Sequence, residues 1–337
     1  MEEKTMLTIR DNFWETIKGG KPDRFVNQYE YMAMVPTPFS LNQPRPVPGG
    51  PPVQDAWGVI RLFPENAPGA FPDHSPDKIV VQDIDCWEDY VKMPNVSFKD
   101  EDWEPYLEMA KQIDRKEKFL TVMLAPGIYE MSHYLCEIQN TLIYFYSNPD
   151  ELKGILDVVT EYEFIMAEEI CKHMHPDAIF HHDDWGSQQS TFISPAMFRE
   201  FIKPCYEKVY GYYKDHGVEI IVHHSDSYAA TLVPDMIDMK IDVWQGVMRS
   251  NNIKELIDTY GGKISFMGGI DSALVDHDGW TEEEARREVR RACDEFGKYY
   301  FIPCLTAGGP ASIYPGVYDR VTEEISDYSK EVFGAGE

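Results

Sequence analysis

The sequence predicts a parallel α/β protein: a (βα)8 TIM barrel with an N-terminal helix and a long proline-rich insertion over the barrel mouth. Three observations favour this class. Short apolar segments alternate with helical segments from residue 77 onwards. Several helical segments end at a glycine just before the next apolar segment, as at Gly217, Gly261 and Gly297. No GxGxxG or Walker motif follows a strand, which disfavours a doubly wound nucleotide-binding fold.

The elements are expected in a regular order. Residues 1–20 predict a short helix with Thr8 as its N-cap and Gly19-Gly20 at its end, and a first strand is expected from Phe25 to Tyr31. Later strands are expected at Leu120 to Leu124, Ala178 to His182, Glu219 to His223, Asp242 to Gln245, Ile264 to Met267 and Tyr299 to Pro303. Helices are expected near 85–92, 101–116, 131–146, 149–174, 194–215, 227–239, 251–261, 280–297 and 316–333.

The segment 36–76 breaks this alternation. It carries prolines throughout and a Gly49-Gly50 pair, so it cannot form a regular helix or a central strand. Only Ala56 to Phe63 favours a short hairpin strand. We interpret 36–76 as a cover segment over the sheet rim, and we expect the eighth strand in or near it. The alternative is a rigid surface loop without a role in the site. Residues 1–337 are expected to form a single barrel domain.

Charge restricts the partners. The chain has 337 residues and a formal net charge of −27, with no Lys/Arg-rich run. Such a surface repels phosphate backbones, so nucleic acid and anionic membrane are excluded as expected partners. There is no CxxC pair, no signal peptide and no apolar run of about 18 residues, which predicts a reduced, cytoplasmic protein. A homodimer is compatible with the sequence, which does not fix the oligomeric state.

Titratable side chains gather where the predicted strands end. The predicted strand segment Val218-Glu219-Ile220-Ile221-Val222 is followed by His223, His224, Ser225 and Asp226. The other strand ends supply Gln28 to Glu30, Glu130 and His133, His181 to Gln188, Gln245, Gly268 to Asp271, and Cys304. Because the carboxyl ends of barrel strands share one mouth, this convergence predicts a functional site there. Side chains alternate along a strand, so one of His181/His182 and one of His223/His224 must point away from the mouth.

A metal site is one interpretation of this cluster. His224 and Asp226 are two residues apart and would point to the same side of an extended strand exit. With the thiolate of Cys304 they would form an open three-ligand zinc site, which a group from 182–184 could also complete. Without a metal, His224 could act as a general acid oriented by Asp226. The alternative is that these histidines are only hydrogen-bonded and that Cys304 is a buried cysteine that binds no metal.

Five segments together resemble a known family. They are Gly20-Lys21-Pro22-Asp23-Arg24, Asp55-Ala56-Trp57-Gly58-Val59, the run from His182 to Gln188, His224-Ser225-Asp226-Ser227 and Gly268-Gly269-Ile270-Asp271. These resemble the uroporphyrinogen decarboxylase superfamily, and within it the cobamide-dependent methyltransferase branch. The arginine cluster with which true decarboxylases hold substrate carboxylates has no counterpart in 27–32. The family's zinc cysteine in its HxC motif is Asp226 here, and its second zinc cysteine corresponds to Ala307-Gly308-Gly309.

The resemblance implies an activity. The chain is similar to the first methyltransferase of anaerobic O-demethylase systems of the veratrol or vanillate type. Such an enzyme moves a methyl group from a methoxylated, aromatic or similar small substrate to the cob(I)alamin of a separate corrinoid protein, and zinc is the implied cofactor. The expected catalytic residues are His224, Asp226, His182 and Asp184, and the expected metal ligands are His224, Asp226 and Cys304. The expected substrate contacts are Tyr29, Glu30, Tyr31, Trp57, Glu130, Asp183, Trp185, Gln188 and Gln245.

Other functions stay open at this point. A methylcorrinoid:tetrahydrofolate or coenzyme M methyltransferase shares the fold but usually needs an intact thiol-activating site. A decarboxylase acting on a smaller acid would release carbon dioxide without a corrinoid. A barrel that binds a corrinoid or metabolite without chemistry is the third alternative.

Overall fold

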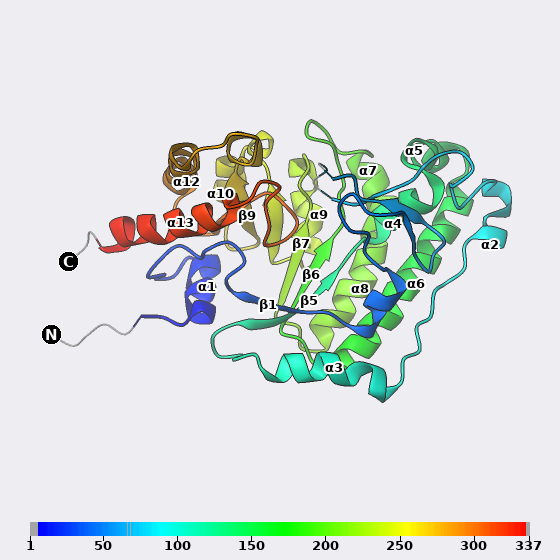
Figure 1. The fold of residues 1–337 in the computed structure, drawn as a ribbon, viewed down its shortest axis with the longest axis horizontal. Helices are drawn as coiled ribbons and strands as arrows, with labels where there is room; N and C mark the ends of the chain where they lie inside the picture. The colour runs from blue at the N-terminus through cyan, green and yellow to red at the C-terminus, as the bar shows by residue number, and fades with distance from the viewer. Residues whose placement is uncertain (1–5, 66, 68, 335–337) are drawn as a thin grey trace.

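A computed structural model describes residues 6–65, 67 and 69–334; Asn66 and Pro68 of the cover segment lie outside the described residues. Seven parallel strands form one curled sheet in the order β1-β5-β6-β7-β8-β9-β10, with helices arranged around it (Figure 1). The strands are β1 Met32–Val35, β5 Phe119–Leu124, β6 Ala178–His182, β7 Ile220–His224, β8 Val243–Val247, β9 Ser265–Ile270 and β10 Phe301–Leu305. The predicted barrel-type α/β fold is thereby confirmed.

Helices follow the strands in the predicted order, but the segment expected as one helix near 131–146 forms two helices, and the α-helix expected near 227–239 begins at Val233. The longer helices are α1 Ile9–Lys18, α3 Asp100–Lys111, α4 Ile128–Cys136, α5 Ile138–Ser147, α6 Pro149–Met174, α8 Lys203–Asp215, α10 Ile253–Tyr260, α12 Glu282–Phe296 and α13 Val317–Gly334. The shorter ones are α2 Trp87–Tyr90, α7 Pro195–Met197, α9 Val233–Asp238 and α11 Ser272–Val275. No helix in the described part of the chain is long and apolar enough to cross a membrane.

Helix α1 closes the floor of the barrel. The Thr8 side chain accepts a hydrogen bond from the Asp11 N–H, and Gly19 ends the helix in the left-handed region at φ 66°, as predicted. The ring of Phe13 is fully buried and stacks on Tyr31, with 4.3 Å between the ring centroids. The aromatic floor excludes water from the amino-terminal end, so the opposite end is left to hold a site.

Alternation along the strands separates an inner face from an outer face. One apolar cluster lines the inside of the curled sheet: it includes Phe119, Ala178, Phe180, Ile220, Val222, Val243, Met267, Ile302 and Cys304. A second, larger cluster joins the outer face to the surrounding helices. Because every second residue points inward, residues 182 on β6 and 224 on β7 continue the inner series at the top of the barrel.

The first strand lies later in the chain than predicted. Residues 28–31 form a turn, since the Glu30 N–H donates to the Asn27 carbonyl and the Met32 N–H to the Tyr29 carbonyl, and Gln28 has φ 50°. The expected strand from Phe25 to Tyr31 is therefore replaced by β1. Propensity alone could not show this, because the turn depends on the Glu30 carboxylate accepting from the Asn27 N–H.

Gln28 joins the two edges of the curled sheet. Its N–H donates to the Pro303 carbonyl, and its side-chain oxygen accepts from the Leu305 N–H at 3.2 Å. Its side-chain amide donates to Thr322 Oγ1 of α13 at 2.8 Å. The eighth strand expected in the proline-rich region is absent from the described residues, and this fully buried glutamine bridges the gap instead.

The cover segment forms a small sheet of its own. Strands β2 Val53–Gln54, β3 Ile60–Leu62 and β4 Phe71–Pro72 are antiparallel, and the 3-10 turn Pro38–Asn42 precedes them. The expected hairpin strand is β3. The Asn42 side chain donates to the Tyr162 hydroxyl of α6 at 2.9 Å, and the Trp57 ring packs edge-on against the same tyrosine. These contacts fix the segment at the barrel rim.

We expect replacement of Gln28 by alanine to lower the free energy of unfolding by about 2 kcal/mol or more, because it leaves the buried Leu305 N–H without its acceptor and removes the hydrogen bond to Thr322. Chemical denaturation measures this difference. The exposed Gln189 is the control position, where alanine should change stability by less than about 0.5 kcal/mol. Equal effects at the two positions would contradict the bridging role.

Candidate active site at the barrel mouth

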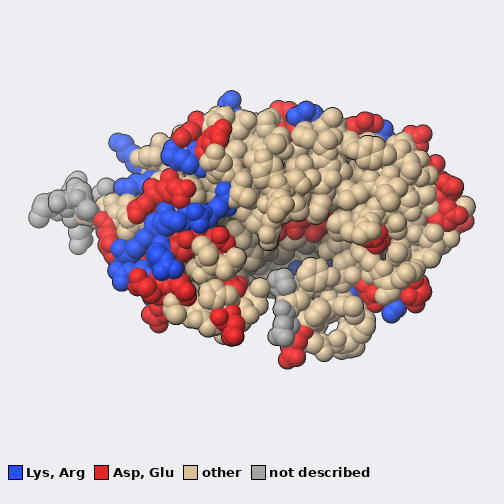
Figure 2. All heavy atoms as spheres, turned by 90° about the horizontal axis from the view of Figure 1, so that it is seen from above, with Lys and Arg blue, Asp and Glu red and all other residues tan. Residues whose placement is uncertain are grey.

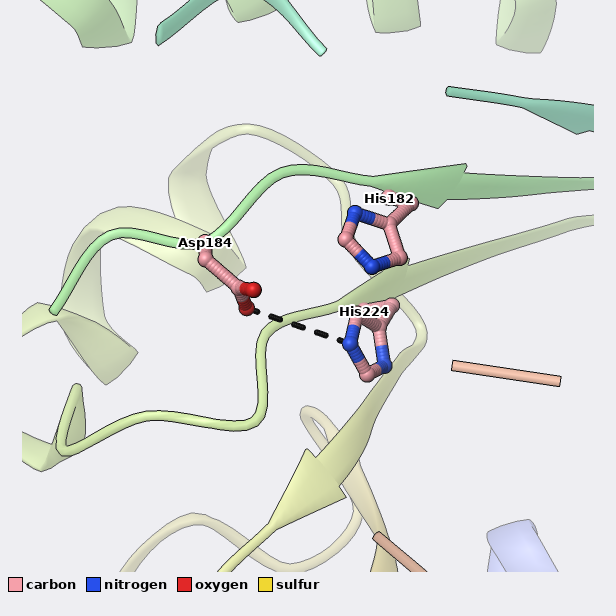
Figure 3. A group of neighbouring side chains, drawn as sticks. All are labelled: His182, Asp184 and His224. Atoms are coloured by element: carbon pink, nitrogen blue, oxygen red, sulfur yellow. Dashed lines mark ion pairs between the residues drawn. The ribbon is translucent and has the colours of Figure 1, made fainter. Parts of the chain in front are cut away.

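Two histidines meet at the carboxyl ends of β6 and β7. His182 and His224 are register partners in the parallel sheet, and both continue the inner face. Their rings stack with 4.2 Å between centroids and 28° between planes (Figure 3). His224 is almost fully buried, whereas His182 keeps about a quarter of its side chain exposed. The pair therefore faces the mouth with His182 nearer the solvent.

Each ring is held through its Nδ1 atom. Nδ1 of His182 lies 2.9 Å from Oε2 of Glu130 on α4, and Nδ1 of His224 is hydrogen-bonded to Oε1 of Gln245 on β8. The Gln245 amide is itself fixed, because it donates to the carbonyls of Leu305 and Ala307. This arrangement leaves the Nε2 atoms of both rings directed away from their supports.

The Asp184 carboxylate supplies a third group that could bind a metal. Its Oδ1 lies 3.8 Å from Nε2 of His224, the contact dashed in Figure 3. The same oxygen accepts from the Asp226 N–H at 2.9 Å, so the loop after β7 positions the carboxylate. One ligand atom each from His182, Asp184 and His224 lies within 4.8 Å of the others; in the described chain this is the group that could hold a metal ion.

The donor set fits a metal. Two imidazoles and one carboxylate suit zinc with an open fourth position. Metal-binding histidines usually have the ring nitrogen that does not bind the metal fixed by a hydrogen bond, which is the arrangement of Glu130 with His182 and of Gln245 with His224. A Cβ atom at Gly308 would lie 3.1 Å from Nε2 of His182 and 3.0 Å from Nε2 of His224, so the bare glycine keeps the space before both nitrogens free.

The two rings differ in charge. Burial works to lower the pKa of His182, but the Glu130 carboxylate, with Asp184 and Asp226, raises it to about 10. Burial, with the neighbouring His182, lowers the pKa of His224 to about 4. At neutral pH without a metal, the pair therefore consists of one imidazolium and one neutral ring. A bound cation would replace the proton of His182.

Most of this chain matches a known protein family. The profile of the uroporphyrinogen decarboxylase (URO-D) family matches residues 74–328, about three quarters of the chain. The chain belongs to the uroporphyrinogen decarboxylase family. The expected opening segments at 20–24 and 55–59 precede the matched residues. No curated protein sequence matches the chain significantly.

Solved structures share the fold of this family member. A methyltransferase from Methanosarcina mazei superposes with a TM-score of 0.65 at 16% identity, over 96% of this chain and 99% of that chain. A glycosylated endo-beta-1,4-xylanase from Gloeophyllum trabeum matches with a TM-score of 0.39 at 9% identity, over 68% of this chain and 81% of that one. The first likeness concerns the fold as a whole.

The histidines that point outward have structural partners. His181 lies against α6, with Nε2 3.4 Å from Oε1 of the buried Glu163. His223 accepts or donates a hydrogen bond with the Tyr210 hydroxyl and stacks on Trp185 at 3.9 Å between centroids. Of the two histidine pairs expected from the sequence, His182 and His224 thus point to the mouth of this uroporphyrinogen decarboxylase family member, and His181 and His223 point away from it.

Asp183 anchors a helix. Its carboxylate is fully buried and accepts from the Tyr129 and Glu130 N–H groups at the start of α4. It also accepts from the Trp185 indole and the Tyr206 hydroxyl. Four donors satisfy the carboxylate, so the expected substrate contacts of Asp183 and Trp185 are replaced by a role in orienting Glu130 towards His182.

Cys304 lies apart from the metal-capable group. Its thiol is fully buried beneath the mouth, and burial raises its pKa, with hydrogen bonds to Gln245 and Tyr29 opposing that rise. Asp226 contributes its N–H to Asp184, and its own side chain is exposed. The expected ligand set of His224, Asp226 and Cys304 is therefore not the one that the structure brings together; His182 and Asp184 take the other two places.

The structure corrects the positions of the expected aromatic contacts. Tyr31 lies in the barrel floor, where its hydroxyl contacts the sulfur of Met267, and Trp57 is packed into the core against α6. Tyr29 is buried beneath the mouth and donates to the Ala307 carbonyl at 2.6 Å. Glu30 accepts from the Asn27 N–H away from the mouth, and Gln188 is exposed.

Sequence reasoning missed the part of the barrel wall beside the histidines, on the two strands that precede β6 in the sheet. Met34 of β1 and Met123 of β5 are half-buried and pack against the inner cluster at the top of the barrel. Arg45 of the cover segment reaches the same side, with Nη2 4.0 Å from the Met123 sulfur. A methionine in an apolar strand carries no signal that separates a pocket wall from a core position, so these residues required the structure.

We expect Gly308→Ala to weaken zinc binding by at least about tenfold, because the added methyl would lie 2.7 Å from Cδ2 of His182 and force the rings apart. Competition with a chromogenic chelator measures the affinity. Gly309 has open space at the same position and provides the matched control, so Gly309→Ala should bind zinc as the unmodified chain does. Unchanged affinity in Gly308→Ala would contradict the site.

A second pair of variants separates the two ligand sets. Asp184→Asn should lose most of the bound zinc because it removes an anionic ligand, whereas Cys304→Ser should retain it because the thiol lies apart from the group. Metal content after equilibrium dialysis provides the readout. Loss of zinc in Cys304→Ser with retention in Asp184→Asn would restore the set expected from the sequence.

Proposed function

We propose that the protein is a corrinoid-dependent methyltransferase. It would move a methyl group from a methoxylated, aromatic or similar small substrate to the cob(I)alamin of a separate corrinoid protein, in the cytoplasm. The observation that carries the proposal is the arrangement of the His182 and His224 Nε2 atoms with Asp184 at an open mouth. The fold likeness to a methyltransferase supports it.

The charge of the mouth argues against decarboxylation of uroporphyrinogen. Glu130 and Asp184 flank the histidine pair. Desolvation in the mouth and the neighbouring Asp184 raise the pKa of Asp226 to about 8, so this third carboxyl is mostly uncharged at neutral pH. Figure 2 looks onto this end and shows acidic atoms along the inner wall of a cleft. A tetrapyrrole with eight carboxylates would meet repulsion there. A neutral methoxy group meets no such penalty.

In the proposed reaction, the side chains must stabilise the charge that develops on the departing oxygen. The cob(I) nucleophile attacks the methyl carbon, the carbon–oxygen bond breaks, and the electron pair stays on the departing oxygen, which is a poor leaving group unless its charge is neutralised. His182, His224 and Asp184 would hold zinc, which when bound acts as a Lewis acid towards that oxygen. Without zinc, the imidazolium of His182, held by Glu130, supplies positive charge at the same place.

The supporting residues preorganise this centre. Gln245 fixes the His224 ring, and its own amide donates to two backbone carbonyls, so the ring cannot rotate without breaking its hydrogen bond to a side chain that is itself held in place. Asp183 holds the start of α4 and with it the Glu130 side chain. Such rigidity reduces the reorganisation needed as charge develops on the oxygen. Met34 and Met123 offer an adaptable wall with sulfur atoms that favour contact with an aromatic ring.

The surface around the mouth suits a protein partner. In Figure 2 the face around the cleft is largely uncharged, whereas acidic and basic side chains gather at the periphery and over the C-terminal helices. The cover segment exposes Leu41, Val47 and Phe71 on its surface. An apolar surface beside a site whose second substrate is carried by another protein fits docking of a corrinoid protein.

We expect reduced cob(I)alamin to lose its absorbance when mixed with the zinc-loaded protein and a methoxylated aromatic such as 1,2-dimethoxybenzene. His224→Ala should lower the rate at least about a hundredfold, because it removes one of the three side chains that would hold the zinc. The exposed His216 is the control position. Release of carbon dioxide without a corrinoid, or a rate unaffected by His224→Ala, would overturn the proposal.

A further inference from the structure

The side-chain amide of Gln245 links the His224 ring to the backbone at the end of β10. Its Nε2 atom lies 3.3 Å from the Leu305 carbonyl oxygen and 3.1 Å from the Ala307 carbonyl oxygen. Its Oε1 atom is hydrogen-bonded to Nδ1 of His224. Gln245 is fully buried, so each of these polar atoms depends on its protein partner rather than on solvent.

The two carbonyls decide which end of the Gln245 amide faces the histidine. A backbone carbonyl oxygen can only accept a hydrogen bond, so the amide atom beside Leu305 and Ala307 must be the NH2 group. Each carbonyl takes one of its two N–H protons. The amide has no proton left for His224, and the oxygen at its other end has to accept from the ring.

The second polar neighbour of the His224 ring does not compete for this proton. A neutral imidazole has one N–H, which lies on either Nδ1 or Nε2. Nε2 of His224 faces Oδ1 of Asp184 at 3.8 Å, beyond hydrogen-bond distance (Figure 3). Nδ1 is in hydrogen-bond contact with the Gln245 oxygen. The proton is therefore held on Nδ1, and Nε2 keeps its lone pair.

The Ala307 carbonyl also fixes the loop that lies against the rings. It accepts from the Tyr29 hydroxyl at 2.6 Å in addition to the Gln245 amide. The next residue is Gly308, where a Cβ atom would lie 3.0 Å from Nε2 of His224. The amide that orients the ring thus also holds the residue that precedes this close approach.

We propose that Gln245 is a positioning residue that fixes His224 as the Nδ1–H tautomer and holds the loop at Gly308 beside the unprotonated Nε2. This inference rests on the metal-binding group of the proposed function and adds which nitrogen of His224 is ready to bind a cation. Side chains of similar length do not replace the glutamine, because an ionised glutamate cannot donate to the two carbonyls and methionine has no N–H.

Nitrogen NMR of the metal-free protein with isotope-labelled histidine tests the tautomer directly. Protonated and unprotonated ring nitrogens give separate signals, and the signals that disappear in His224→Gln belong to this residue. At neutral pH we expect a protonated Nδ1 and an unprotonated Nε2. A proton on Nε2 of His224 in the unmodified chain would overturn the inference, and this measurement requires no variant of Gln245 to fold.

Two matched variants extend the test to metal binding. Gln245→Met removes the acceptor and both donors, so the His224 signals should show a mixture of tautomers and zinc should bind about tenfold to a hundredfold more weakly. Tyr210→Phe removes the buried hydrogen bond at Nδ1 of the outward His223 and should change neither the His224 signals nor the zinc affinity. An equal loss of zinc in both variants, or an unchanged tautomer in Gln245→Met, would reduce Gln245 to a packing residue.

The tautomer of His224 does not depend on turnover. The expected tautomer and zinc affinities without any methyl transfer to cob(I)alamin would leave the role of Gln245 standing and defeat the proposed reaction. Methyl transfer by a chain whose His224 carries its proton on Nε2 would defeat the inference and leave the reaction standing.

Discussion

The site depends on one constraint, which is that every second side chain of a parallel barrel strand points inward. His182 and His224 are register partners on adjacent strands, so the same alternation that buries Phe180 and Val222 brings the two imidazoles together. A shift of one residue on either strand would bring an outer histidine inward and send its neighbour to the helices. The aromatic floor and the Gln28 bridge maintain the curled sheet on which this register depends.

The two histidines at the mouth differ in charge because they differ in depth and in hydrogen-bond partner. The inner His224 is neutral because it is buried and fixed by an uncharged amide, whereas the outer His182 is fixed by a carboxylate that stabilises its protonated form. Asp183 is fully buried behind the pair and accepts from the N–H groups at the start of α4 rather than facing the site itself. Two chemically identical rings thus acquire different roles through the residue bonded to Nδ1.

Much of the fold was predictable from the sequence, because the period of its apolar residues reports directly on strands and helices. The convergence of the 182–184 and 224–226 segments was also predictable, since strand ends meet at one rim. Three features were not. The turn at 28–31 depends on a side-chain hydrogen bond, the choice of Asp184 rather than Cys304 depends on depth within the barrel, and the placement of Arg45 depends on how an irregular segment packs. Tyr31 and Trp57 show the same limit, because aromatic residues near strand ends and in motifs fill cores as readily as pockets.

The uncharged face around the cleft has a kinetic consequence. Association through such a surface gains little from long-range attraction, so the encounter rate should be that of unsteered proteins and should vary weakly with ionic strength. The net charge of −27 meanwhile disfavours the approach of other acidic molecules to the protein as a whole. A partner is then selected by the shape that it presents to the rim and by how long it stays, rather than by how quickly it arrives.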